Sequence, residues 1–144
     1  MAMDRETEKR EIESKLSGYF AGRGEIDAAI LFGSFASGRF RPGSDVDVAV
    51  HSKSPLSPEA LADLRTDLSV LCRREVDLAD LSRAEGMFLL QIMTKGERVK
   101  FDHAVYHRYV MKALGYREDF LPIQRACWDE SVRRLIDGQG PASS

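Results

Sequence analysis

The chain has 144 residues, 31% of them charged, and a formal net charge of −2. This length predicts one domain with a single core, and the near balance of charge argues against a protein that coats nucleic acid. No apolar run reaches transmembrane length, and the charged residues 3–15 lack the apolar stretch of a signal peptide. We therefore expect a cytoplasmic protein that does not bind a membrane.

The N-terminal part of the chain predicts a helix followed by two strands. Apolar residues recur at helical spacing over 4–19 and at the next position, namely Ile12, Leu16, Tyr19 and Phe20. The glycines of 22–24 are expected to end this helix. Residues 26–32 and 45–51 are apolar or alternating runs typical of strands. Their short separation leaves no room for a full crossover helix, so an antiparallel pair is expected.

The middle of the chain predicts a helix and a third strand. Ser57 is suited to cap a helix whose first position is Pro58. That helix is expected over 58–73, where leucines recur at helical spacing: Leu61, Leu64, Leu68 and Leu71. The third strand is expected over 75–81.

The C-terminal part predicts three helices and one short strand. A helix is expected over 82–95, followed by a short strand over 99–101. A further helix should run to about Leu114, break at Gly115 and be followed by another over 118–136. This last helix is strongly amphipathic and contains the only tryptophan of the chain.

Together these elements predict an α+β fold. We expect an α/β sandwich in which a small mixed sheet has helices packed on one face, with a helical C-terminal segment. A single domain should occupy 1–137, and the Gly-, Pro- and Ser-rich residues 138–144 should form a flexible tail. Cys72 and Cys127 lie in helical apolar patterns and are expected to be reduced and buried.

Two aspartates at the start of the second strand are candidate metal ligands. Side chains alternate along a strand, so Asp45 and Asp47 should point the same way, opposite to Val46 and Val48. Carboxylates aimed at one small volume repel each other unless a cation lies between them. Hard oxygen ligands of this kind suit Mg²⁺, which completes its coordination with water and substrate phosphates.

A Gly-Ser turn after the first strand is a candidate phosphate site. If Ser34 opens a short helix after Gly33, backbone N–H groups and a hydroxyl face an anion there. Arg39, in the loop that follows, is a further candidate for phosphate contact, although loop arginines are most often only solvated. Phosphate binding at one end and a metal at the other predict a nucleoside triphosphate site.

The third carboxylate of such a site has two candidates. Asp77 and Asp80 are an odd number of residues apart, so only one of them can face the site from a regular strand. Val76 and Leu78 should face the core, which favours Asp77. Asp80 lies at the strand end and is the alternative, or else a cap for the next helix.

The pattern G-S-x10-D-x-D, from Gly33 to Asp47, resembles the signature of the DNA polymerase beta nucleotidyltransferase superfamily. More narrowly, the chain resembles the minimal nucleotidyltransferase (MNT) proteins encoded beside HEPN-domain partners, which act as antitoxins. Residues 75–81 resemble the third-carboxylate strand of that family. The resemblance is strong over 28–102 and loose at both termini.

This resemblance implies an enzyme that transfers AMP from ATP to a tyrosine of a HEPN-domain RNase toxin and so neutralises it. The expected site holds two Mg²⁺ ions on Asp45, Asp47 and Asp77, with Gly33 and Ser34 gripping the leaving phosphates. A hetero-oligomer with the toxin is implied, without direct nucleic-acid binding. The resemblance leaves the roles of the remaining arginines near the site open.

Two other functions remain open from the residues alone. One is nucleotidyl transfer to a small hydroxylated molecule, which normally requires a further domain to hold the acceptor. The other is neutralisation of a partner by occlusion, without catalysis. His103 and His107 share helical i, i+4 spacing, but without a third ligand they more simply belong to a polar helix face.

Overall fold

The computed structural model describes residues 4–120 of the chain, in five α-helices, one 3₁₀ helix and four strands. Their order is α1 (Arg5–Ala21), β1 (Ile26–Phe32), α2 (Gly33–Ser37), β2 (Val46–Ser52), α3 (Pro58–Cys72), β3 (Val76–Asp80), η1 (Leu81–Arg83), α4 (Gly86–Lys95), β4 (Glu97–Phe101) and α5 (His103–Phe120).

The four strands form one mixed sheet in the order β3-β2-β1-β4. β1 runs antiparallel to both β2 and β4, whereas β2 and β3 are parallel and are connected through α3. The mixed sheet, the antiparallel first pair and the short fourth strand are confirmed. A parallel pair requires a long crossover, and α3 provides it.

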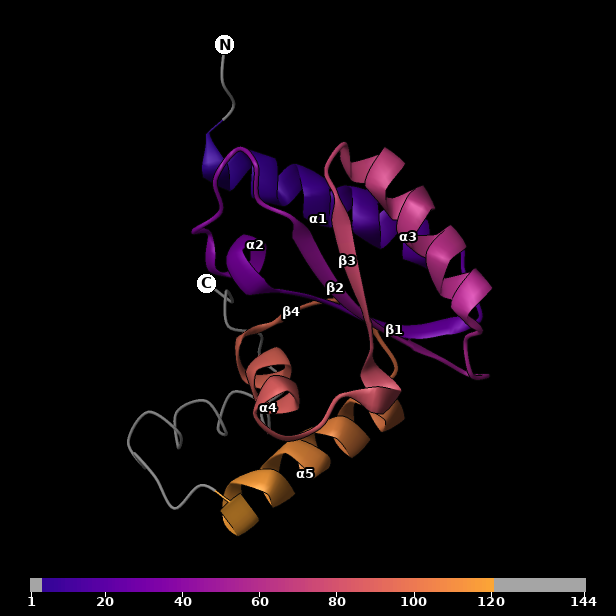
Figure 1. Ribbon diagram of the computed structural model, residues 1–144, viewed down its shortest axis with the longest axis vertical. Helices are drawn as coiled ribbons and strands as arrows, with labels where there is room; N and C mark the ends of the chain where they lie inside the picture. The colour runs from indigo at the N-terminus through magenta and orange to yellow at the C-terminus, as the bar shows by residue number, and fades with distance from the viewer. Residues whose placement is uncertain (1–3, 121–144) are drawn as a thin grey trace.

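Helices cover both faces of the sheet, as Figure 1 shows, so the prediction that they pack on one face is wrong. α1 and α3 pack on one face over Val46, Val48 and Val50, and α4 and α5 pack on the other over Ala28 and Ile30. The physical reason lies in β1, which is buried along nearly its whole length on both sides. The continuous apolar run from Ala28 to Phe32 needs cover on each face.

Local capping chemistry explains where two of the helices begin. The carboxylate of Asp4 accepts a hydrogen bond from Thr7 N at 2.8 Å at the start of α1, and the hydroxyl of Ser57 accepts one from Ala60 N at 3.1 Å at the start of α3. Each satisfies a backbone donor that has no partner within its helix. The predicted Ser57 cap, with Pro58 at the first helical position, is confirmed.

Two helix boundaries differ from the sequence prediction. α4 begins at Gly86 instead of Ser82, because Asp80 bonds the backbone N–H and hydroxyl of Ser82 and closes a separate 3₁₀ turn. α5 continues through Gly115 to Phe120 where a break was expected. A single glycine costs only about 1 kcal/mol in a helix, which is too little to end one that packs along α4.

Some predictions fall outside the described residues. These are Cys127, the segment 121–136 of the expected last helix, and the tail over 138–144. Cys72 is buried, and burial raises the pKa of its thiol, as expected for a reduced core residue. Within residues 4–120, no helix is long and apolar enough to cross a membrane.

Candidate active site

Asp45 directly precedes β2, and Asp47 is its second residue, on the face of the sheet opposite the α1/α3 core. Val46 and Val48 are buried in that core, so the alternation of the strand turns Asp47 to the α4/α5 face. Asp47 pairs with Phe32 of β1 on one side and with Asp77 of β3 on the other. It is half-buried.

The sheet register brings Asp77, and not Asp80, beside Asp47. Paired residues of neighbouring parallel strands project on the same face, and Asp77 is the partner of Asp47 in the β2–β3 ladder. Asp80 instead accepts hydrogen bonds from Ser82 N at 3.0 Å and Ser82 Oγ at 2.7 Å. Asp80 therefore caps η1, and capping the helix after the strand was the alternative role that the sequence offered for it.

Gly33 lies directly against Asp47. Its φ of 73° is in the left-handed region, and a Cβ built on it would overlap the Oδ2 atom of Asp47. Both the backbone conformation and the close approach require glycine at this position. The Gly-Ser turn and the aspartate strand, fourteen positions apart at Gly33 and Asp47 in the numbering, therefore meet at one point.

The carboxylates of Asp77 and Asp45 lie near enough to Asp47 to disfavour its negative charge. Burial, and after it the negative charges of Asp77 and Asp45, together raise the pKa of the Asp47 carboxyl from 3.8 to about 6. A carboxylate whose negative charge is disfavoured by its surroundings is stabilised when a cation binds beside it. The arrangement thus has the electrostatics of a metal site.

Asp47→Asn should stabilise the metal-free protein at neutral pH. The pKa of Asp47 is higher in the folded protein, at about 6, than in the unfolded chain. Ionisation of Asp47 therefore lowers the free energy of unfolding as the pH rises above the unfolded pKa, and the full loss is present above about pH 6. After discounting for solvent screening, we expect a gain of about 1 kcal/mol near neutral pH. Thermal unfolding with a chelator should show this gain near pH 8 and lose most of it near pH 4. An equal gain at both pH values would contradict the prediction.

The phosphate end of the site is the first turn of α2. The residue at its N-cap is Phe32, whose side chain accepts no hydrogen bond from the N–H groups of this turn. The Ser34 side chain is half-buried in the same turn, whereas the Arg39 side chain is exposed two residues beyond the end of α2. Gly33 and Ser34 are thus near the carboxylates, while Arg39 lies at the margin.

The donor set fits a magnesium ion that is shared with a substrate. Asp45, Asp47 and Asp77 offer only hard carboxylate oxygens. Among the residues that the structure describes, no three His, Cys, Asp or Glu side chains are grouped closely enough to hold an ion by themselves. Mg²⁺ usually takes one or two carboxylates and completes its shell with substrate phosphates and water, so the two observations are compatible.

This geometry agrees with a family model. Residues 14–102 match the model described as polymerase beta, nucleotidyltransferase, which covers the whole sheet and the helices α2, α3 and α4. The chain belongs to this family.

The relatives of the chain within the family include toxin–antitoxin proteins. It is 33% identical over 75 residues to the protein adenylyltransferase MntA of Shewanella oneidensis, which covers 52% of this chain and 54% of MntA. The chain thus matches about half the length of this curated relative.

Solved structures with the same fold include toxin–antitoxin complexes. One is a toxin–antitoxin crystal structure with AMP-PNP, with a TM-score of 0.66, 24% identity and coverage of 82% of this chain and 96% of the other. Another is a tri-AMPylated Shewanella oneidensis HEPN toxin in complex with MNT antitoxin, with a TM-score of 0.59, 21% identity and coverage of 88% and 97%. At these identities the likeness establishes the nucleotidyltransferase fold.

Other residues singled out by the sequence take no part in this site. His103 and His107 are exposed in the first turns of α5, as expected for a polar helix face. One residue that the sequence left without a role, Arg74, contacts the loop that leads into Asp45. Its position in the sequence carries no signal for this contact, because the loop lies thirty residues earlier at Ser44.

Proposed function

We propose that this protein is a magnesium-dependent adenylyltransferase that acts as an antitoxin. It transfers AMP from ATP to a tyrosine of a HEPN-domain RNase toxin and thereby neutralises the toxin. The observation that carries the proposal is Asp47, a carboxylate held against Gly33 with its pKa raised to about 6 by burial, Asp77 and Asp45. A protein that only binds a partner has no physical need for clustered, mutually repelling carboxylates.

Each predicted side chain has a role in this proposal. Asp45, Asp47 and Asp77 hold two Mg²⁺ ions, which when bound neutralise phosphate charge and lower the pKa of the attacking hydroxyl. Gly33 and Ser34 bind the phosphates that leave as pyrophosphate, through the open N–H groups of α2. Arg39 adds a positive charge at the margin of the phosphate site.

The transfer itself is an in-line displacement at phosphorus. The tyrosine oxygen forms a bond to the α-phosphorus of ATP, the bond between the α-phosphorus and the bridging oxygen to the β-phosphate breaks, and pyrophosphate leaves. Asp77 orients the tyrosine hydroxyl and assists the departure of its proton. A half-buried site with fixed carboxylates contributes mainly by positioning and electrostatics.

The proposed partner is a HEPN toxin, bound in a hetero-oligomer in the cytoplasm, where ATP is available. Two observations support it. The adenylyltransferase MntA is a sequence relative of this chain, and chains of the same fold occur in complexes of an MNT antitoxin with an AMPylated HEPN toxin.

We expect covalent AMP on the partner toxin after incubation with this protein, ATP and Mg²⁺. Intact-mass spectrometry of the proposed HEPN partner should show additions of AMP mass, and tyrosine should be the modified residue. The matched control is Asp47→Asn, which keeps the size of the side chain and removes its charge. If the toxin is neutralised with no change in mass, occlusion replaces catalysis as the function.

A further inference from the structure

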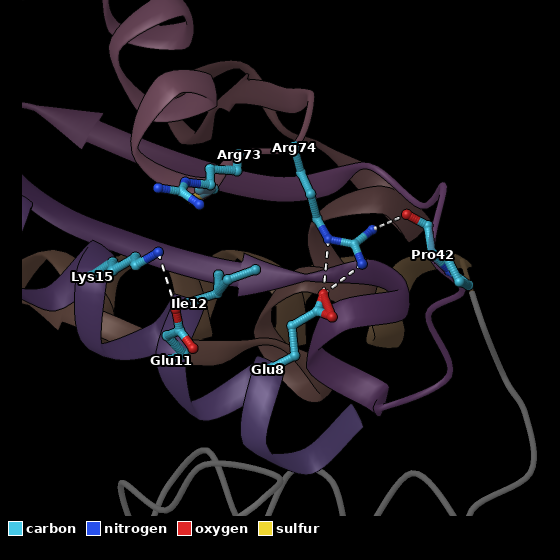
Figure 2. A pocket seen from close by; sticks show the side chains of 8 residues that line it. Glu8, Glu11, Ile12, Lys15, Pro42, Arg73 and Arg74 are labelled. Carbon is cyan, nitrogen blue, oxygen red and sulfur yellow. Dashed lines mark hydrogen bonds and ion pairs between the residues drawn. The ribbon is translucent and has the colours of Figure 1, made fainter. Parts of the chain in front are cut away.

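Arg74, in the turn between α3 and β3, holds the loop that leads into Asp45. Its Nη1 atom lies within hydrogen-bonding distance of three main-chain carbonyl oxygens of this loop, those of Arg41 at 3.1 Å, Pro42 at 2.9 Å and Ser44 at 2.9 Å. Figure 2 shows the guanidinium directed at Pro42. Nη1 carries two hydrogens, which the three acceptors share, and the other nitrogens of the planar guanidinium can bond a further partner at the same time.

The other side of the same guanidinium is anchored to α1. Arg74 Nε donates to Glu8 Oε2 at 3.0 Å, and Nη2 contacts the same oxygen, as Figure 2 shows. The two side chains are only 12% and 26% exposed. Charge-assisted hydrogen bonds that are shielded from water are stronger than exposed ion pairs, so Arg74 has a firm attachment point outside the loop.

The guanidinium also covers an aromatic pair that connects the loop with α2. Phe35 of α2 and Phe40 of the loop stack with their ring centres 3.8 Å apart and their planes 6° apart. The Arg74 guanidinium carbon lies 4.8 Å and 5.5 Å from these two ring centres. A cation over aromatic rings is attracted to them, so Arg74 contacts both the element that carries Ser34 and the loop before Asp45.

We propose that Arg74 is a positioning residue for nucleotidyl transfer, an inference that rests on the proposed function. It holds the loop over 40–44 in the conformation that places Asp45 beside Asp47. Ser44 adjoins Asp45, so movement of its carbonyl moves that carboxylate as well. On the other side of Asp45, Val46 N donates to Glu75 O at 2.9 Å and fixes the start of β2. The position of Asp45 therefore depends mainly on the conformation of the loop over 40–44.

The test measures the magnesium requirement of AMP transfer in Arg74→Met and Arg74→Lys. Arg74→Met keeps the apolar stem and loses every contact of the guanidinium, so we expect the Mg²⁺ concentration for half-maximal rate to rise about 10-fold and the rate at saturating ATP to fall by about 10- to 100-fold. Arg74→Lys keeps the charge without the fork and should be intermediate. An excess of Mg²⁺ should partly restore both variants but not Asp45→Asn.

Arg73 provides the matched control. It precedes Arg74, carries the same charge and lines the same pocket of about 320 Å³, which Figure 2 shows. No hydrogen bond or ion pair joins its side chain to the part of the chain that the structure describes. Its φ of 55° suits asparagine, so Arg73→Asn removes the charge with little strain and should leave the magnesium requirement unchanged.

The outcomes separate this inference from the proposed function. If the unmodified protein transfers no AMP, the proposed function fails. If it transfers AMP and Arg74→Met has a lower melting temperature but the same magnesium requirement as Arg73→Asn, Arg74 is merely structural and the inference is wrong. Should Arg74→Met not fold, Arg74→Lys decides the matter, because an unchanged requirement in that variant overturns the inference equally.

Discussion

Replacing Asp47 with asparagine should lower AMP transfer by on the order of 10²–10³-fold, comparable to the removal of one preorganised electrostatic contact in other enzymes. Asp45→Asn should have a similar effect. Asp47 lies at the centre of the candidate site, because it pairs with Asp77 of the neighbouring parallel strand and lies against Gly33. Asparagine keeps one neutral amide oxygen at this position, so the proposed metal site would lose its central anionic ligand.

Two measurements distinguish this loss of catalysis from loss of the fold. Mg²⁺ together with ATP should raise the melting temperature of the unmodified protein, since ligands that bind only the folded state stabilise it. The same additions should have little effect on Asp47→Asn. Because removal of the charge relieves repulsion, the metal-free variant should melt no lower than the unmodified protein. A variant with near-normal turnover would exclude Asp47 as a metal ligand.

Asp77→Asn is expected to lower the transfer rate by about 10²-fold, while Asp80→Asn leaves it nearly unchanged. The two carboxylates are three residues apart, but only Asp77 lies opposite Asp47 in the register of β2 and β3. Asp80 is bonded to Ser82 at the start of η1. Asparagine can keep that cap, so Asp80→Asn should also retain most of the stability of the protein.

ATP binding gives this comparison a second readout. Because Asp77 is proposed to act near the attacking hydroxyl and not at the phosphates, Asp77→Asn should weaken transfer far more than nucleotide binding. Calorimetric titration with ATP, together with the transfer rate, separates the two effects. An inactive Asp80→Asn beside an active Asp77→Asn would show that the catalytic carboxylate comes from the strand end.

Sequence patterns predicted the local part of this structure, because the interactions that decide it lie within a few residues. The strand over 26–32 is apolar at every position except Asp27, and α3 begins with Ser57 and Pro58 in their preferred positions. Alternation along 75–81 also selected Asp77 over Asp80. Such choices depend on the period of a strand, which the sequence itself displays.

Two boundaries were predicted wrongly, one because of a local side-chain bond and the other because of packing between helices. The bond from Asp80 to Ser82 interrupts the apolar pattern that continues into α4, and packing against α4 keeps α5 helical through Gly115. In both cases the propensities are weak, at about 1 kcal/mol or less, and side-chain bonding or packing outweighs them.

Only the tertiary structure decided how the parts of the site are held together. That helices cover both faces follows from the burial of β1 between two layers, and that Gly33 touches Asp47 follows from the register of β1 and β2. The attachment of the loop before Asp45 depends on Arg74, which reaches it from the end of another helix. Contacts between distant segments leave no periodic trace in a sequence, because they are set by how completed elements pack.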